Sequence, residues 1–183
     1  MDAPVQTPLG RTRGQRLPWL LLAASVAVLL SRALFLPPTL EDIDSVNFAL
    51  ALERFDPRLH QPHPPGYPVY VLLARVVHAV IPDPPRALGL LSALAQAALV
   101  LPLFALFSRL SSTPGRAALS TLLVLCCPIL WFNGARPMSD SVGLLFVISS
   151  QALLLRSLDK VTTLPAASLV AGLALGVRLQ TGA

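Results

Sequence analysis

Long apolar runs separated by short polar segments dominate the sequence. The runs cover residues 17–36, 87–107, 117–132, 141–155 and 164–177. A helix needs about 20 mostly apolar residues to cross roughly 30 Å of hydrocarbon, and the first run has about that length. Each of the others is also a candidate membrane helix. The pattern therefore predicts an all-α fold, a polytopic transmembrane bundle of about five spans with additional juxtamembrane helices.

The composition supports lipid as the surrounding solvent. Apolar residues make up 54% of the chain and charged residues only 13%, and the mean hydropathy is +0.67, which disfavours a soluble domain. The net charge of +5 comes from scattered residues that are not interleaved with aromatics, so nucleic-acid binding is not indicated. Cys126 and Cys127 are adjacent within an apolar run, and we interpret them as core residues rather than a disulfide framework.

The segment 69–81 is a special case, because it is short for a span, is bracketed by prolines and carries Arg75 and His78. It either crosses the membrane or lies along its surface. Short cytoplasmic loops are enriched in Lys and Arg. If the segment does not cross, the later basic residues fall on the same side as Arg11, Arg13 and Arg16; they are Arg109, Arg116, Arg156 and Lys160. We therefore expect a non-crossing juxtamembrane helix.

This topology divides the chain into a cytoplasmic N-terminal tail, residues 1–16, and a transmembrane module, residues 17–183. The module contains an external loop, residues 37–86, with juxtamembrane helices. Most of the acidic residues then lie on the non-cytoplasmic face: Glu41, Asp42, Asp44, Glu53, Asp56, Asp83 and Asp140. In the last run, Gly172 and Gly176 have the spacing of a close helix-packing contact and predict a partner helix.

Two short motifs carry the candidate chemistry of the external loop. Asp44 begins a predicted helix over residues 44–55 that Pro57 ends. Its carboxylate is either the N-cap of that helix or a catalytic group. The second motif is a rigid turn, His63-Pro64-Pro65-Gly66-Tyr67-Pro68, in which the prolines fix φ and the glycine relaxes one position before the chain re-enters a helix.

The combination of Asp44-Ser45 with the His63 to Pro68 turn resembles the first external loop of the membrane glycosyltransferases of the C superfamily. These include the protein O-mannosyltransferases and the aminoarabinose transferases, and the turn is most similar to that of their uncharacterised bacterial relatives. Residues 86–92 and 134–140 also look typical of the family. The resemblance covers only the N-terminal portion of such enzymes, which commonly have more spans, so we expect this chain to be a truncated counterpart.

The resemblance implies a sugar donor carried on a polyprenyl phosphate and a reaction on the non-cytoplasmic face of a bacterial inner membrane. It implies that Asp44 deprotonates or orients the acceptor hydroxyl. His63, Tyr67 and Arg136 are the implied substrate contacts, with Arg136 suited to a phosphate; an interfacial arginine that reaches lipid headgroups is the alternative. Arg75 and His78 face either substrate or headgroups. The mannosyltransferases have a second acid where this chain has Ser45, and Asp42 is the alternative carboxylate, at a different spacing.

Two other function classes stay open. The chain is alternatively a non-enzymatic polytopic membrane protein, a degenerate copy or a subunit that binds a partner through Gly172 and Gly176. A transporter is less favoured, because the runs contain few ionisable residues at mid-membrane depth. The sequence shows no cluster of His, Cys and carboxylates at metal-ligand spacing. A divalent metal is left open, with Asp44 and His63 as its only suggested contributors.

Overall fold

The computed structural model describes residues 11–182, and this part of the chain is all-α, as predicted. It contains eight α-helices: α1 (Arg11–Ala33), α2 (Ile43–Glu53), α3 (Pro68–His78), α4 (Pro84–Leu110), α5 (Pro114–Leu125), α6 (Pro128–Asn133), α7 (Asp140–Ser157) and α8 (Leu164–Val177). Three short 3₁₀ segments accompany them: η2 (Pro57–Leu59), η3 (Val161–Thr163) and η4 (Leu179–Gly182). The predicted N-terminal tail falls partly outside the described residues, and its residues 11–16 form the first turns of α1.

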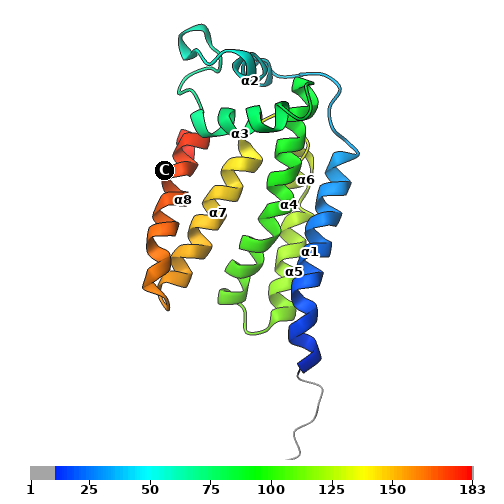
Figure 1. Cartoon of the computed structure of the whole chain (residues 1–183). Coiled ribbons are helices and arrows are strands. Elements are labelled where there is room, and N and C mark those ends of the chain that lie inside the picture. Colours follow the sequence, from blue (N-terminus) through cyan, green and yellow to red (C-terminus); the bar gives the residue numbers. More distant parts are fainter. Residues whose placement is uncertain (1–10, 183) are drawn as a thin grey trace, which may run out of the picture.

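The long helices lie side by side, and two shorter helices cover one end of the bundle. Figure 1 shows α1, α4, α5, α7 and α8 running up and down in turn, while α2 and α3 lie across the end where α1 finishes and α4 begins. We call residues 37–83, which contain α2, η2 and α3, the cap. The segment 69–81 therefore lies across the bundle end rather than along it.

Prolines set the start of half of the eight helices. They occupy the first helical position of α3, α4, α5 and α6. A proline is favoured there because the missing backbone N–H would have no partner in the first turn and because its fixed φ suits a helix. This is why the proline-rich boundaries predicted the helix limits closely.

The predicted run over residues 117–132 is not one helix. It divides into α5 and α6 at Cys126 and Cys127, just before Pro128. Pro128 has no N–H to donate to the carbonyl of Val124, and its ring disfavours helical backbone at the preceding residue. Instead, the N–H of Cys127, three residues after Val124, donates to the Val124 carbonyl at 3.1 Å. This hydrogen bond closes a tighter turn than an α-helix has. The helix of the first run also ends earlier than predicted: α1 stops at Ala33, whereas the apolar run continues to residue 36.

Within residues 11–182, one helix, α4, is long and apolar enough to cross a membrane, and half of its most apolar window is buried. The apolar stretches Leu17–Ala33, Pro68–His78, Pro114–Leu125 and Val161–Val177 are shorter. A single such helix is equally typical of the core of a soluble protein. Length and apolarity alone therefore establish the helical fold and no more.

The core has two parts that meet along α4. Phe48 of α2, Tyr70 of α3 and Leu88 of α4 are almost fully buried in the part beneath the cap. Leu99 and Leu103 of α4 pack with Val28 of α1 in the other part. Because α4 contributes to both clusters, it fixes the position of the cap relative to the rest of the bundle.

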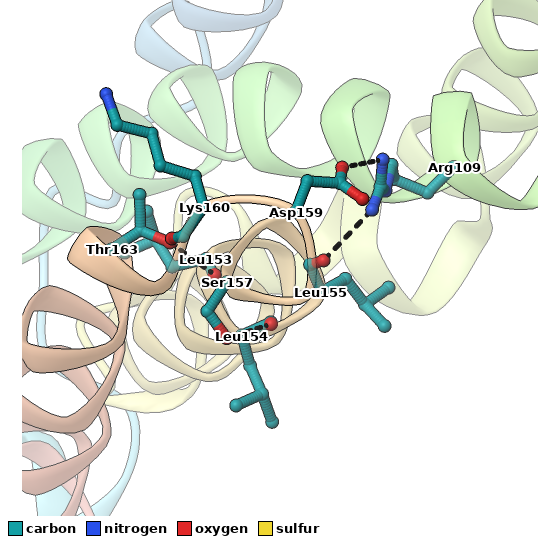
Figure 2. A network of polar contacts seen from close by, with 8 residues as sticks. All are labelled: Arg109, Leu153, Leu154, Leu155, Ser157, Asp159, Lys160 and Thr163. Atoms are coloured by element: carbon teal, nitrogen blue, oxygen red, sulfur yellow. Dashed lines mark hydrogen bonds and ion pairs between the residues drawn. The ribbon is translucent and has the colours of Figure 1, made fainter.

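Polar contacts hold the opposite end of the bundle together. Figure 2 shows Arg109, in the last turn of α4, reaching the turn that follows α7. Its guanidinium forms an ion pair of 2.5 Å with Asp159 and donates a hydrogen bond of 3.1 Å to the Leu155 carbonyl. In the same turn Thr163 donates to the Lys160 carbonyl at 2.9 Å. The connection between α7 and α8 is thereby tied to the end of α4.

Candidate functional site

The cap brings Asp44 and the His63 turn together. Asp44 Oδ1 lies 3.6 Å from Nδ1 of His63, and Nε2 of His63 lies 3.1 Å from the Tyr67 hydroxyl. The first distance is slightly longer than a hydrogen bond, and the second is within hydrogen-bonding range. Two motifs that are about 20 residues apart in sequence thus form one constellation.

Asp44 is not the N-cap of α2, so that alternative role is wrong. The N-cap is Asp42, whose backbone is extended and whose N–H donates to the Ser45 hydroxyl at 3.2 Å. The Ser45 hydroxyl in turn donates to the Asp42 carbonyl at 2.6 Å. A cap of this kind satisfies backbone groups that the first helical turn leaves unpaired. Asp44 stands in the first turn with its carboxylate free of a capping role and 43% exposed.

The turn places His63 by means of unusual backbone conformations. Gly66 has φ +104°, a region open mainly to glycine, and the next residue, Tyr67, has φ +47°. A left-handed conformation in a bulky residue is uncommon and is often found at functional sites. Pro64 and Pro65 precede this step and Pro68 begins α3. The predicted rigid turn is therefore present, and its last residues aim the Tyr67 ring back toward His63.

Aromatic rings enclose the constellation on its inner side. The Phe48 ring lies 5.3 Å from the His63 ring and 5.1 Å from the Tyr67 ring, centroid to centroid, and the Tyr67 ring is edge-on to it. These distances are in the favourable range for aromatic pairs. Tyr67 is 7% exposed. The rings thus hold His63 and Tyr67 against the core while Asp44 stays accessible from outside.

Burial raises the pKa of the Tyr67 phenol above its usual value. The nearby Arg178 guanidinium lowers this pKa in part, and the Asp44 and Asp140 carboxylates raise it further. Tyr67 is consequently neutral at physiological pH and able to donate its proton to Nε2 of His63. In the tautomer that accepts this hydrogen bond at Nε2, the ring proton is on Nδ1, the atom nearest the Asp44 carboxylate.

Arg136 lies at a different place from Asp44. Its guanidinium forms an ion pair of 2.5 Å with the Asp42 carboxylate. Ser92 of α4 supports the backbone around it, because the Ser92 hydroxyl bonds the Arg136 carbonyl at 2.6 Å and the Met138 carbonyl at 3.1 Å. The two family-like segments, residues 86–92 and 134–140, are therefore in contact.

A cavity of about 410 Å³ opens beside this ion pair. It is lined by the end of α1, the following loop and the segment after α6: Ser31, Arg32, Phe35, Leu36, Pro37, Pro38, Thr39, Glu41, Asp42, Trp131, Phe132, Ala135, Arg136 and Pro137. Asp44, His63 and Tyr67 do not line it. The candidate residues named from the sequence thus lie in two places. Asp44, His63 and Tyr67 are together in the cap, and Arg136 is at the neighbouring cavity.

Arg32 is the residue at this cavity that the sequence analysis missed. It is 3% exposed and donates to the Gln96 side chain at 3.2 Å, the Ser31 hydroxyl at 2.8 Å and the Leu125 carbonyl at 2.9 Å. Its Cζ atom lies 3.9 Å from the centre of the Trp131 ring. The available signal was the presence of an arginine and of Gln96 inside otherwise apolar runs.

Arg75 and His78 lie away from both places. The Arg75 guanidinium donates two hydrogen bonds to the Ala51 carbonyl, at 2.8 and 3.2 Å, and so joins α3 to the end of α2. His78 is half-buried in the last turn of α3, and in the described part of the chain no hydrogen bond or ion pair reaches its side chain. Neither side chain is adjacent to Asp44.

The two glycines of α8 differ in their surroundings. Gly176 lies against Val69 of α3, so closely that a Cβ atom at this position would overlap the Val69 side chain. Gly172 faces open space within 4 Å. The close contact at Gly176 is thus with the cap of the same chain. Of these two glycines, only Gly172 is open to another molecule.

Among residues 11–182 no group of three or more His, Cys, Asp or Glu side chains is arranged to hold a metal ion. The chain matches no protein-family model, no curated protein and no solved structure. The geometry of the cap and of the neighbouring cavity is therefore the basis for a functional assignment.

Proposed function

We propose that the chain is an integral membrane protein whose cap lies at the non-cytoplasmic membrane surface. Large apolar side chains on the outer helices support this placement. Many are more than half exposed, including Trp19, Leu20 and Leu30 of α1, Leu119, Leu122 and Leu123 of α5, and Leu169 of α8. Soluble monomers rarely expose so many large apolar side chains together, whereas lipid favours them at the surface.

The charges at the two bundle ends support the orientation. Arg109, Arg116 and Arg156 belong to the terminal turns of α4, α5 and α7 that lie opposite the cap. The cap carries most of the acidic residues. Because cytoplasmic loops are enriched in Lys and Arg, the end opposite the cap is assigned to the cytoplasm. In this arrangement α1, α4, α5 with α6, α7 and α8 are the five crossing segments, and α3 lies along the surface.

We further propose that the cap carries the reacting groups of a glycosyltransferase that uses a polyprenyl-phosphate sugar. The contact between Asp44 and His63 is the observation that carries this proposal. Asp44 is the general base, because its carboxylate is accessible at the surface where such a donor presents its sugar. The acceptor hydroxyl oxygen forms a bond to the anomeric carbon as its proton passes to Asp44. The bond from the anomeric carbon to the phosphate oxygen breaks, and the polyprenyl phosphate leaves with the electron pair.

His63 is a positioning residue in this scheme. Its Nδ1 is the atom nearest the Asp44 carboxylate, at 3.6 Å, and Tyr67 contacts the ring from the other side, so the imidazole is in place to orient that carboxylate. Such support keeps a general base within hydrogen-bonding reach of its substrate. The strained backbone at Tyr67 is the structural cost of that arrangement.

The test is transfer of radiolabelled sugar from polyprenyl-phosphate donors, measured in membranes that contain the full chain. Replacement of Asp44 by Asn should reduce transfer roughly 100-fold or more, since a positioned general base contributes about 10²–10⁴-fold. Asp56→Asn is the matched control, because Asp56 is also in the cap but pairs with Arg54 at 2.9 Å. Equal transfer by the Asp44→Asn and Asp56→Asn variants would remove Asp44 from the reaction. Absence of transfer by the unaltered chain with every donor would favour the non-enzymatic alternative.

A further inference from the structure

The buried guanidinium of Arg32 is a positive charge without an acidic partner. Its three hydrogen-bond acceptors, an amide, a hydroxyl and a backbone carbonyl, are all uncharged. In the described part of the chain no carboxylate lies within ion-pairing distance of Arg32. Burial of a charge is costly unless an opposite charge or strong hydrogen bonds compensate it. The missing counter-charge points to a ligand.

The guanidinium also has unused donors. A guanidinium has five N–H groups, and three of them are accounted for by the acceptors of Arg32. The Trp131 ring covers one face of the guanidinium plane, and Arg32 also lines the cavity. A planar pair of N–H groups at a cavity wall matches two oxygens of a phosphate.

A second arginine stands at the same cavity. Arg136 lines it and is held by the Asp42 carboxylate, with the Arg136 and Asp42 side chains 45% and 41% exposed. An anion that enters the cavity would compete with Asp42 for Arg136. Glu41 and Asp42 also line the cavity, and their negative charge repels an anion. An anion that contacts only one of the two arginines is therefore disfavoured.

The rim of the cavity is apolar and exposed. Phe35 and Phe132 line it and are 68% and 73% exposed; Leu34, next to Phe35, and Ile129, three residues before Phe132, are 81% and 68% exposed. A free phosphate ion makes no favourable contact with these apolar side chains, whereas the hydrocarbon chain of a lipid buries them. The cavity therefore combines a fixed cation inside with an apolar exit.

We propose that this cavity binds the phosphate group of a membrane lipid, with Arg32 as the fixed cation and Arg136 as the second, released from Asp42. The inference rests on the membrane placement under the proposed function and not on sugar transfer. It assigns the phosphate to a site whose lining does not include Asp44, His63 or Tyr67. If the lipid is the polyprenyl-phosphate donor, the site holds its phosphate beside the cap.

The chain provides its own reporter for this site. It has two tryptophans, Trp19 and Trp131, and Trp131 is the one stacked on Arg32. In a Trp19→Phe background, the emission of Trp131 is followed in maltoside micelles, which contain no phosphate. Three probes are titrated: farnesyl phosphate, farnesol and inorganic phosphate. Farnesol has the same hydrocarbon chain without the phosphate, and inorganic phosphate has no hydrocarbon chain.

Farnesyl phosphate should change the emission saturably, while farnesol and inorganic phosphate should need at least roughly tenfold higher concentrations, because each lacks one part of the recognition. Equal binding of farnesol would mean an apolar cavity without a phosphate site. Equal binding of inorganic phosphate would mean a site for the free ion. Either result overturns the proposal.

Variants of the ion pair give opposite expected signs. Asp42→Asn removes the competitor and should tighten farnesyl phosphate binding several-fold, whereas Arg136→Gln should weaken it by about tenfold. Arg86→Gln is the control, since Arg86 is exposed, does not line the cavity and pairs with Asp83 at 3.4 Å. If Asp42→Asn and Arg136→Gln both behave like Arg86→Gln, the proposal fails. Absence of transfer by the unaltered chain, with phosphate binding intact, would refute the proposed reaction and leave this site standing.

Discussion

Arg75 holds the carbonyl oxygen of Ala51 with two guanidinium hydrogen bonds and so fixes α3 to the last turn of α2. The Ala51 carbonyl belongs to the end of a helix, where backbone acceptors lack partners within the helix. A positive charge at this helix end is also favoured by the helix dipole. Arg75, a candidate for substrate contact in the sequence, therefore has a structural role within the cap.

Replacement of Arg75 by Met should loosen the cap. The variant loses charge-assisted hydrogen bonds to a part-buried carbonyl, a loss of about 1.5–3 kcal/mol. Limited proteolysis at neutral pH should show faster cleavage in the cap. Arg58→Met is the control, because Arg58 is exposed and, in the described chain, its side chain makes no hydrogen bond. Equal cleavage of the two variants would contradict the structural role of Arg75.

Gly66→Ala should destabilise the protein by about 1–3 kcal/mol, because an L-residue is strained in this conformation. Gly66 has φ +104°, and a Cβ atom there would also meet the Pro57 ring at 3.3 Å. Gly115→Ala is the matched control, since Gly115 lies in the first turn of α5 with open space around it. Thermal unfolding in detergent should show a lower Tm for the first variant and an unchanged or slightly higher Tm for the second. A tolerated alanine at position 66 would mean that the turn has another conformation.

The two tyrosines of the chain, Tyr67 and Tyr70, should ionise only at unusually high pH. Burial raises the pKa of both phenols. A raised pKa in the folded state contributes stability that is complete below the unfolded pKa of about 10 and is lost as the pH rises through the folded pKa. Absorbance titration of tyrosinate in the folded protein should therefore occur at higher pH than in the denatured chain, which should titrate near 10. A folded-state transition for either tyrosine at or below about pH 10 would contradict its burial.

The ion pair between Arg109 and Asp159 should make a small contribution that depends on pH and salt. The hydrogen bond from Arg109 lowers the pKa of the Asp159 carboxyl below its usual 3.8. The contribution is therefore present above pH 3.8 and is lost as the pH falls through the lowered pKa. Asp159→Asn should lower the Tm slightly at neutral pH in low salt, and about 1 M salt should remove the difference. Lys160→Gln, in the same turn, should show no such salt dependence.

The proposed membrane placement predicts which residues can be labelled from outside. In a chain with Cys126 and Cys127 replaced by alanine, a cysteine at position 56 should react with an impermeant thiol reagent added to intact cells. A cysteine at position 112, between α4 and α5 at the opposite end of the bundle, should react only after the membrane is opened. The reverse pattern would place the cap in the cytoplasm. Equal labelling without opening would contradict the membrane placement itself.

The helices were largely predictable because prolines and apolar runs act locally. The charge distribution predicted that segment 69–81 does not cross a membrane; α3 lies across the bundle end, and its relation to a membrane stays a prediction. The break before Pro128 was missed because apolar residues continue on both sides of it. Here the loss of one backbone donor outweighs the hydrophobic pattern.

The site was predictable only in part. The sequence placed Asp44 and His63 in one loop, and the turn at Gly66 and Tyr67 brings them within 3.6 Å. The buried pair of Arg32 and Gln96 was not foreseen, because 64 residues separate the partners. A polar residue in an apolar run signals that a partner exists but does not identify it. Only the packing of α1 on α4 does so.

The close contact between Gly176 and Val69 has a consequence for biosynthesis. The cap is made early, but part of its support is the final turn of α8, which leaves the ribosome roughly 100 residues later. At about 5–20 residues per second, the delay is roughly 5–20 seconds. Until then the His63 turn lacks the neighbour that holds the start of α3 in place. In nascent chains arrested before α8 emerges, the cap should therefore not yet be packed in its final position.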